Sequence, residues 1–183
     1  IADAVSEQIM TLSYATSFTV INNREVELAE RIAAKTPGDL NRIYFTTGGS
    51  TAVDSALRLC QLASNIKGQP HRKHILTREK AYHGSTYLSA SITGKERDKT
   101  AMDIMRDGVH FLSAPCYFYH PEFATEAEFC DFLGDELEQK ILELGPENIM
   151  CFIAEPVMAS GGVIVPPADY NYRCWQMVKK HEI

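Results

Sequence analysis

The chain has 183 residues, of which 45% are hydrophobic, 9% aromatic and 23% charged, and this globular composition excludes a disordered or collagen-like protein. Its formal net charge is −6, and no cluster of lysines and arginines offers the cationic surface that nucleic acids require, so we expect no nucleic-acid partner. No apolar run approaches the roughly 20 residues that a membrane span needs, so we expect no membrane association.

Hydrophobic periodicity and turn residues predict alternating helices and strands along the chain. We expect two early helices at residues 2–13 and 25–34, the second capped by Asn22 or Asn23. Later helices are expected at 51–65, 84–93, 126–144 and 169–181, and short strands at 42–46, 74–77, 109–112 and 149–154. Strands that alternate with helices in this way indicate βαβ units, so the fold class is α/β with a parallel sheet.

The cysteines and histidines indicate a reducing compartment and no metal centre. The five cysteines, Cys60, Cys116, Cys130, Cys151 and Cys174, are an odd number with wide spacing and no C-x-x-C motif. We therefore expect reduced thiols and a cytoplasmic protein. Cys116 with His120, and His71 with His74, have spacings that suit a metal ion, but neither pair has companion ligands at zinc-site spacing.

Ligands of parallel sheets gather beyond the carboxyl ends of the strands, and the first segment with that position is 46–50. Its two glycines permit close approach of a ligand, and the helix start with the Ser50 and Thr51 hydroxyls forms an anion cradle. The alternative is a plain turn in which Ser50 is the N-cap. The phosphate-binding patterns of nucleoside triphosphatases and dinucleotide-binding proteins are absent, which argues against those ligands.

Two further segments follow later strands. In 81–85 the aromatic ring of Tyr82 and the imidazole of His83 stand beside Gly84, where a flat ligand can stack. The alternative there is a packed tyrosine and a solvated histidine. Glu155 follows the most strand-like run of the sequence, and a carboxylate at such a position is either paired or functional.

Taken in order, these segments resemble the class III aminotransferases, which are fold-type I pyridoxal-phosphate (PLP) enzymes. Residues 38–50 are similar to the family stretch that ends in its phosphate-binding Gly-Ser, and 81–86 match the family motif A-Y-H-G-x-T. Residues 152–157 and 161–167 match the stretches around A-E-P-V and G-G-V-I-V-P-P. The order and spacing make this resemblance specific, and it spans nearly the whole chain.

The resemblance implies a three-layer αβα fold with a mostly parallel sheet. Residues 1–36 are then an N-terminal helical segment, and residues 37–183 are part of the large PLP-binding domain. The residues that it implies for cofactor binding are Gly49, Ser50, Tyr82, His83, Gly84 and Glu155. In this pattern the first two hold the PLP phosphate, the tyrosine stacks on the pyridine ring, and the histidine and Gly84 line the same wall.

Glu155 is implied to lie near the ring, where it helps to orient the family's aspartate on the pyridinium nitrogen. That aspartate and the cofactor-binding lysine are expected beyond Ile183, and the lysines of this chain match no part of that motif. We therefore interpret the 183 residues as an inactive fragment of a longer protein. The family also implies a homodimer, and residues 13–18 resemble a segment near its interface.

Two departures from the family pattern bear on the substrate. Thr51 stands where the family often has glutamate, and the neutral residues 158–160 replace the Gln-Gly-Glu that is typical of enzymes acting on ornithine or γ-aminobutyrate. This resembles the ω-amino acid or amine:pyruvate branch, and implies transfer of an amino group to a 2-oxo acid. The alternatives are a non-catalytic module for another phosphorylated ligand, a related PLP enzyme such as an aminomutase or racemase, and a structural remnant.

Overall fold

The computed structural model describes residues 1–16 and 18–183. The chain divides into two compact units, Ile1–Phe45 and Thr46–Ile183. The division predicted between residues 36 and 37 follows the family pattern and stays a prediction. Within the described residues, no helix is both long and apolar enough to cross a membrane.

The first unit holds α1 (Ala2–Thr11) and α2 (Asn23–Ala33). The predicted cap of α2 is confirmed at Asn22, whose side-chain oxygen accepts a hydrogen bond from the Glu25 N–H at 2.9 Å. Of the segment 13–18 that resembles a dimer-interface segment, Ser17 lies outside the described residues.

The strand predicted at 42–46 is wrong, because these residues are irregular in the structure. The Tyr44 side chain is 74% exposed, so the aromatic and β-branched pattern does not mark a buried strand here. A strand requires a neighbour that completes its backbone hydrogen bonds. Among the described residues no strand pairs with this segment.

The second unit is built around a parallel sheet of β1 (His74–Arg78), β2 (Val109–Leu112) and β3 (Ile149–Phe152). The described strands have the order β2-β1-β3. Leu76 of β1 pairs with His110 of β2 and with Phe152 of β3. The three strands predicted in this unit are thus confirmed, and β1 is the central one.

Four α-helices surround this sheet: α3 (Gly49–Ile66), α4 (Tyr87–Ser91), α5 (Glu126–Leu144) and α6 (Tyr170–Lys180). Short 3-10 turns occupy Glu96–Asp98, Tyr117–Tyr119 and Pro146–Asn148. The predicted helix 84–93 is shortened to α4, because Gly84 has a φ of +134° and Thr86 forms a capping box with Ser89. A positive φ ends helical geometry before α4 begins.

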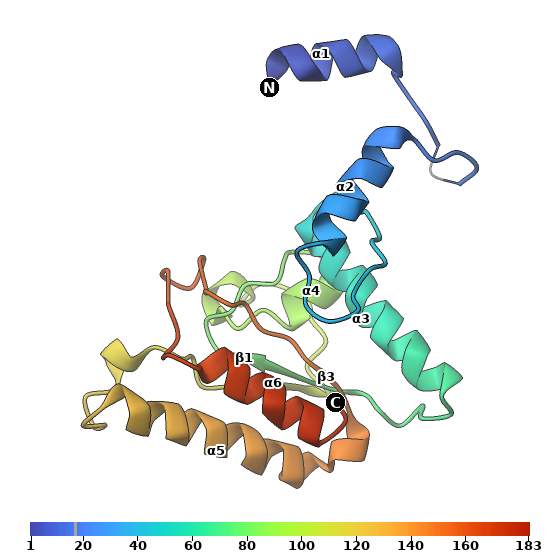
Figure 1. Ribbon diagram of the computed structural model, residues 1–183. Helices are drawn as coiled ribbons and strands as arrows, with labels where there is room; N and C mark the ends of the chain where they lie inside the picture. Colours follow the sequence, from blue (N-terminus) through green and yellow to red (C-terminus); the bar gives the residue numbers. More distant parts are fainter. Residues whose placement is uncertain (17) are drawn as a thin grey trace. The chain divides into compact units, whose positions relative to one another are not determined.

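Alternating residues of β1 build the two faces of the sheet. Leu76 packs in a core with Leu133 and Leu137 of α5, whereas Ile75 packs with Leu57 of α3 on the other face. Because successive side chains of a strand point in opposite directions, one strand supplies both cores. Figure 1 shows α5 and α6 on one side of the strands and α3 with α4 on the other. The predicted three-layer α/β architecture is confirmed.

The core beneath α5 gives a first test of this packing. Phe129 is fully buried and stacks on His120 at a centroid distance of 4.6 Å. Phe129→Ala should lower the free energy of unfolding by about 3–5 kcal/mol because it leaves a cavity. Phe132, one turn further along α5, is 40% exposed, so Phe132→Ala should cost clearly less. Urea denaturation of both variants measures the difference, and equal losses would contradict this assignment of the core.

Candidate functional site

The first turn of α3 has backbone N–H groups that make no hydrogen bond within the helix. The Gly48 C=O accepts the first helical hydrogen bond, from the Ala52 N–H at 2.9 Å. The N–H groups of Gly49, Ser50 and Thr51 therefore have no partner within the helix. Together with the helix dipole, such groups bind anions.

The hydroxyl groups at this helix start differ in what they contact. Thr51 Oγ1 donates to the Gly48 C=O at 2.8 Å, so its hydroxyl turns back to the backbone. Ser50 Oγ accepts the Ser85 N–H at 3.0 Å. The N-cap of α3 is Gly48, so the alternative in which Ser50 is the N-cap is wrong. Ser50 instead connects α3 to the loop that follows β1.

Gly84 permits this contact between the loop and α3. A Cβ atom at Gly84 would lie 2.6 Å from Ser50 Oγ, 2.8 Å from Ser50 Cα and 2.5 Å from Ser89 Oγ. Its φ of +134° is also a conformation that residues with a side chain rarely adopt. Both the space and the backbone therefore require glycine at this position.

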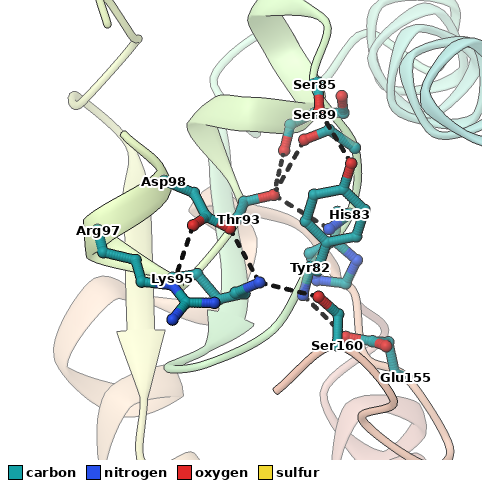
Figure 2. A network of polar contacts seen from close by, with 11 residues as sticks. Tyr82, His83, Ser85, Ser89, Thr93, Lys95, Arg97, Asp98, Glu155 and Ser160 are labelled. Carbon is teal, nitrogen blue, oxygen red and sulfur yellow. Dashed lines mark hydrogen bonds and ion pairs between the residues drawn. The ribbon is translucent and has the colours of Figure 1, made fainter. Parts of the chain in front are cut away.

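Tyr82 lies at the surface of the same loop, with contacts at both ends of the residue (Figure 2). Its N–H donates to Glu155 Oε1 at 2.9 Å, and its hydroxyl lies 2.9 Å from Ser85 Oγ. The side chain is 39% exposed. The ring is thus held in place while part of its surface remains open to a ligand.

His83 points into the protein. It is only 7% exposed, and its Nε2 lies 3.0 Å from Thr77 Oγ1, while its backbone N–H donates to Thr93 Oγ1 at 3.0 Å. Burial lowers the pKa of His83 and Arg78 lowers it further, against an opposing effect of Glu155. The loop therefore has an exposed tyrosine and a buried, neutral histidine, the reverse of a packed tyrosine beside a solvated histidine.

Glu155 is paired through both its side chain and its backbone. The carboxylate accepts the Tyr82 N–H, and the backbone C=O accepts a hydrogen bond from the guanidinium of the buried Arg78. The structure thus shows Glu155 as paired, and its place beside a cofactor ring stays a prediction. The pairing holds the end of β3 against the loop after β1.

The structure thus brings Ser50, Tyr82, Gly84 and Glu155 into one connected site, with Ser85 between the first two. The His83 side chain lies beneath this site, with its ring turned toward Thr77. Sequence reasoning missed Lys95, whose Nζ lies 5.5 Å from the centre of the Tyr82 ring. No group of three or more metal-ligating side chains occurs in the described part of the chain.

This site fits a flat ligand that carries a phosphate. Free N–H groups at the α3 start suit a phosphate. The Tyr82 ring suits an aromatic face. The absent Cβ of Gly84 allows the two segments to approach each other. These are the groups that a phosphorylated pyridine such as PLP requires.

Comparison with known proteins shows the family of this chain. The family profile described as "Aminotransferase class-III" matches residues 1–183, so the chain belongs to the class III aminotransferase family. It is 38% identical to a probable gamma-aminobutyrate transaminase 4 of Oryza sativa subsp. japonica, over 98% of this chain and 38% of that protein. It is 36% identical to a vanillin aminotransferase of Capsicum frutescens, over 100% of this chain and 40% of that protein.

A solved structure, the omega transaminase from Pseudomonas jessenii in complex with PMP, has the same fold. Its TM-score is 0.93 at 35% sequence identity, and the match covers 100% of this chain and 41% of that chain. The chain therefore spans about two fifths of the length of the relatives that it matches.

A substitution of Gly84 tests the close approach to α3. Gly84→Ala should destabilise the protein by several kcal/mol and weaken ligand binding, because its methyl group meets Ser50 and φ is positive. Gly134→Ala is a matched control in α5, where a Cβ would meet no atom within 4 Å, and should stabilise the helix by about 0.5–1 kcal/mol. Thermal unfolding measures both; a neutral Gly84→Ala would refute the steric argument.

The buried His83 predicts an acid sensitivity. The pKa of His83 is lowered from its ordinary 6.5 in the folded protein, so the unfolded chain takes up this proton first. Its share of stability is present above pH 6.5 and is lost as the pH falls below that value. His83→Gln should remove this part of the pH dependence below about pH 6.5, as followed by urea denaturation. A pH dependence that is the same in His83→Gln and in the unmodified protein would contradict this role of the buried imidazole.

Proposed function

We propose that this chain is the cofactor-cradling part of a PLP-dependent transaminase. The parent protein would transfer an amino group from an ω-amino acid or amine to a 2-oxo acid such as pyruvate. The observation that carries this proposal is the connection of the open α3 start to the exposed Tyr82 ring through Ser85, in a chain of the class III aminotransferase family. The named relatives are transaminases, which agrees with this reaction.

The phosphate would be held at the start of α3. The backbone N–H groups of Gly49 and Ser50 would donate to phosphate oxygens, and the helix dipole would stabilise the negative charge. The Ser50 hydroxyl, which accepts the Ser85 N–H, still has its own proton to donate. These groups form the phosphate cradle, and the Gly84 backbone closes it on one side.

The pyridine ring would lie on Tyr82, with His83 and Gly84 in the wall behind it. The Glu155 carboxylate would lie near the ring and help to orient the aspartate that the family supplies for the pyridinium nitrogen. When bound, PLP supplies an electron sink for the carbanion that forms as the substrate loses its Cα proton. In this proposal the residues described here bind and orient the cofactor. None of the lysines in this chain lies in a motif that matches the family's proton-transferring lysine.

The proposed substrate class is supported by the hairpin after Glu155. Residues 158–164 close through an antiparallel bridge between Met158 and Ile164, and Met158, Ala159 and Ser160 carry no charge. Such a loop suits an amine or an ω-amino acid rather than a second carboxylate bound at this point. The named plant relatives are gamma-aminobutyrate transaminases, although the neutral loop argues against that substrate, so γ-aminobutyrate is one of the donors in the assay below.

We further propose a homodimer in the cytoplasm. The family pattern supports the dimer. The free thiols of all five cysteines, which lie in the described part of the chain, support a reducing compartment. Some relatives are named as mitochondrial, so fractionation of cells that express the tagged full-length protein is the direct measurement.

The proposed function is tested on the full-length natural protein that contains these residues. Alanine formation from pyruvate, with γ-aminobutyrate, β-alanine or 1-phenylethylamine as donor, measures the reaction, and 2-oxoglutarate replaces pyruvate to test the acceptor. Ser50→Ala should weaken PLP binding about tenfold, because one hydrogen bond to a charged group is lost. Ser64→Ala is the matched control, since Ser64 lies on the same helix and its hydroxyl donates to the Cys60 C=O.

Two results would contradict the proposal. One is a protein that binds PLP with the same affinity after Ser50→Ala, which would move the phosphate away from α3. The other is a protein that binds phosphorylated ligands but transfers no amino group from any donor, which would favour a non-catalytic binding module.

A further inference from the structure

Lys95 connects three segments that surround the exposed ring of Tyr82 (Figure 2). Its Nζ donates to Ser160 Oγ at 2.9 Å and pairs with Asp98 Oδ2 at 2.9 Å. The same ammonium lies 5.5 Å from the centre of the Tyr82 ring. Its side chain is only 14% exposed, so this lysine is held in place rather than extended into solvent.

The backbone before Lys95 is clamped to the loop that carries Tyr82. The Gly94 N–H donates to the Ala81 C=O at 2.8 Å, and the Gly94 C=O accepts the Lys80 N–H at 3.0 Å. A Cβ atom at Gly94 would lie 2.1 Å from the Arg78 C=O. The position of Lys95 relative to Tyr82 is therefore set by tight backbone contact, and only glycine fits beside it.

The hairpin 158–164 is fixed to the same region from the other side. A Cβ atom at Gly161 would lie 2.7 Å from the Lys80 C=O, so the tip of the hairpin packs closely on the chain before Tyr82. Ser160 at this tip accepts the hydrogen bond from Lys95. The hydrogen bond with Lys95 lowers the pKa of the Asp98 carboxyl, which favours the charged form of Asp98.

We propose that Lys95 is a positioning residue for Tyr82, with its ammonium on one face of the ring and the other face left for a flat ligand. A cation over an aromatic ring is attracted by the negative charge of the ring face. The contact also opposes rotation of the ring, whose hydroxyl is already held by Ser85. This role rests on the proposed function, because the ligand it prepares for is the pyridine ring of PLP.

The rival role for Lys95 is direct binding of a substrate carboxylate by its ammonium. The existing partners argue against it, since Ser160 and Asp98 already occupy this ammonium at hydrogen-bond distance. The two roles also differ in what they change. A positioning residue alters cofactor affinity through Tyr82, whereas a substrate-binding residue alters the KM of the carboxylate substrate.

The first measurement compares PLP and inorganic phosphate as ligands of the full-length protein. Lys95→Met should weaken PLP binding about fivefold, as expected from loss of one partly buried cation–π contact, and should leave the Kd for phosphate unchanged. Lys95→Arg keeps the cation and should restore most of the PLP affinity. Lys179→Met is the matched control, because its ammonium lies 4.8 Å from the Trp175 ring centre on α6.

A double-mutant cycle then tests whether Lys95 acts through the ring. In a Tyr82→Leu background, Lys95→Met should have no further effect on the Kd for PLP. An equal loss in both backgrounds, or a raised KM for the 2-oxo acid with an unchanged Kd for PLP, would overturn the positioning role. An unchanged Kd for PLP after Lys95→Met would also overturn the positioning role. A parent protein that binds no PLP at all would overturn the proposed function itself.

A second measurement requires no cofactor. The Lys95 ammonium lies over the Tyr82 ring, so the adjoining ε-methylene protons should show an upfield NMR shift from its ring current. Tyr82→Leu should remove that shift, and Lys179 should serve as the unaffected reference. Lys95 protons at ordinary positions in the unmodified protein would show that the contact is absent, and would refute the inference whether or not PLP binds.

Discussion

The site depends on the close approach of the Gly84 backbone to the first turn of α3. Without that approach the Ser85 N–H does not reach Ser50, and the loop that carries Tyr82 is no longer tied to the open N–H groups of the helix. The constraint is steric, since atoms within 3 Å of the missing Cβ exclude every side chain. The open start of α3 and an aromatic ring are therefore joined in one site because Gly84 has no side chain.

A second constraint links this site to the sheet. β1 ends at Arg78, and its guanidinium contacts the Glu155 C=O after β3. The Glu155 carboxylate in turn accepts the Tyr82 N–H. Neighbouring parallel strands thus place two loops side by side at their carboxyl ends, which is where ligands of such sheets are found. The strands place the two loops near each other, and the polar contacts between the loops then fix their relative positions.

The sequence was sufficient to predict elements that are defined by local interactions. Helix 126–144 begins and ends where α5 does, because Thr125 and Glu128 form a capping box and Gly145 follows its last turn. The prediction of a strand at 42–46 was wrong because strand formation depends on a partner strand, which the residue pattern alone does not reveal. The predicted start of helix 84–93 was wrong because the contact of Gly84 with Ser50 determines the backbone conformation at that position.

The same distinction holds for the candidate site. The sequence alone predicts site residues that lie in family motifs, namely Gly49, Ser50, Tyr82 and Glu155. The inward direction of His83 and the place of Lys95 depend on tertiary contacts, namely the bond to Thr77 and the clamp at Gly94. The loop beneath the site is held largely by hydroxyl groups, with Ser89, Ser91 and Thr93 almost fully buried. Since hydroxyls of serine and threonine do not titrate in water, these contacts keep the same form in the acidic range in which the buried His83 takes up a proton.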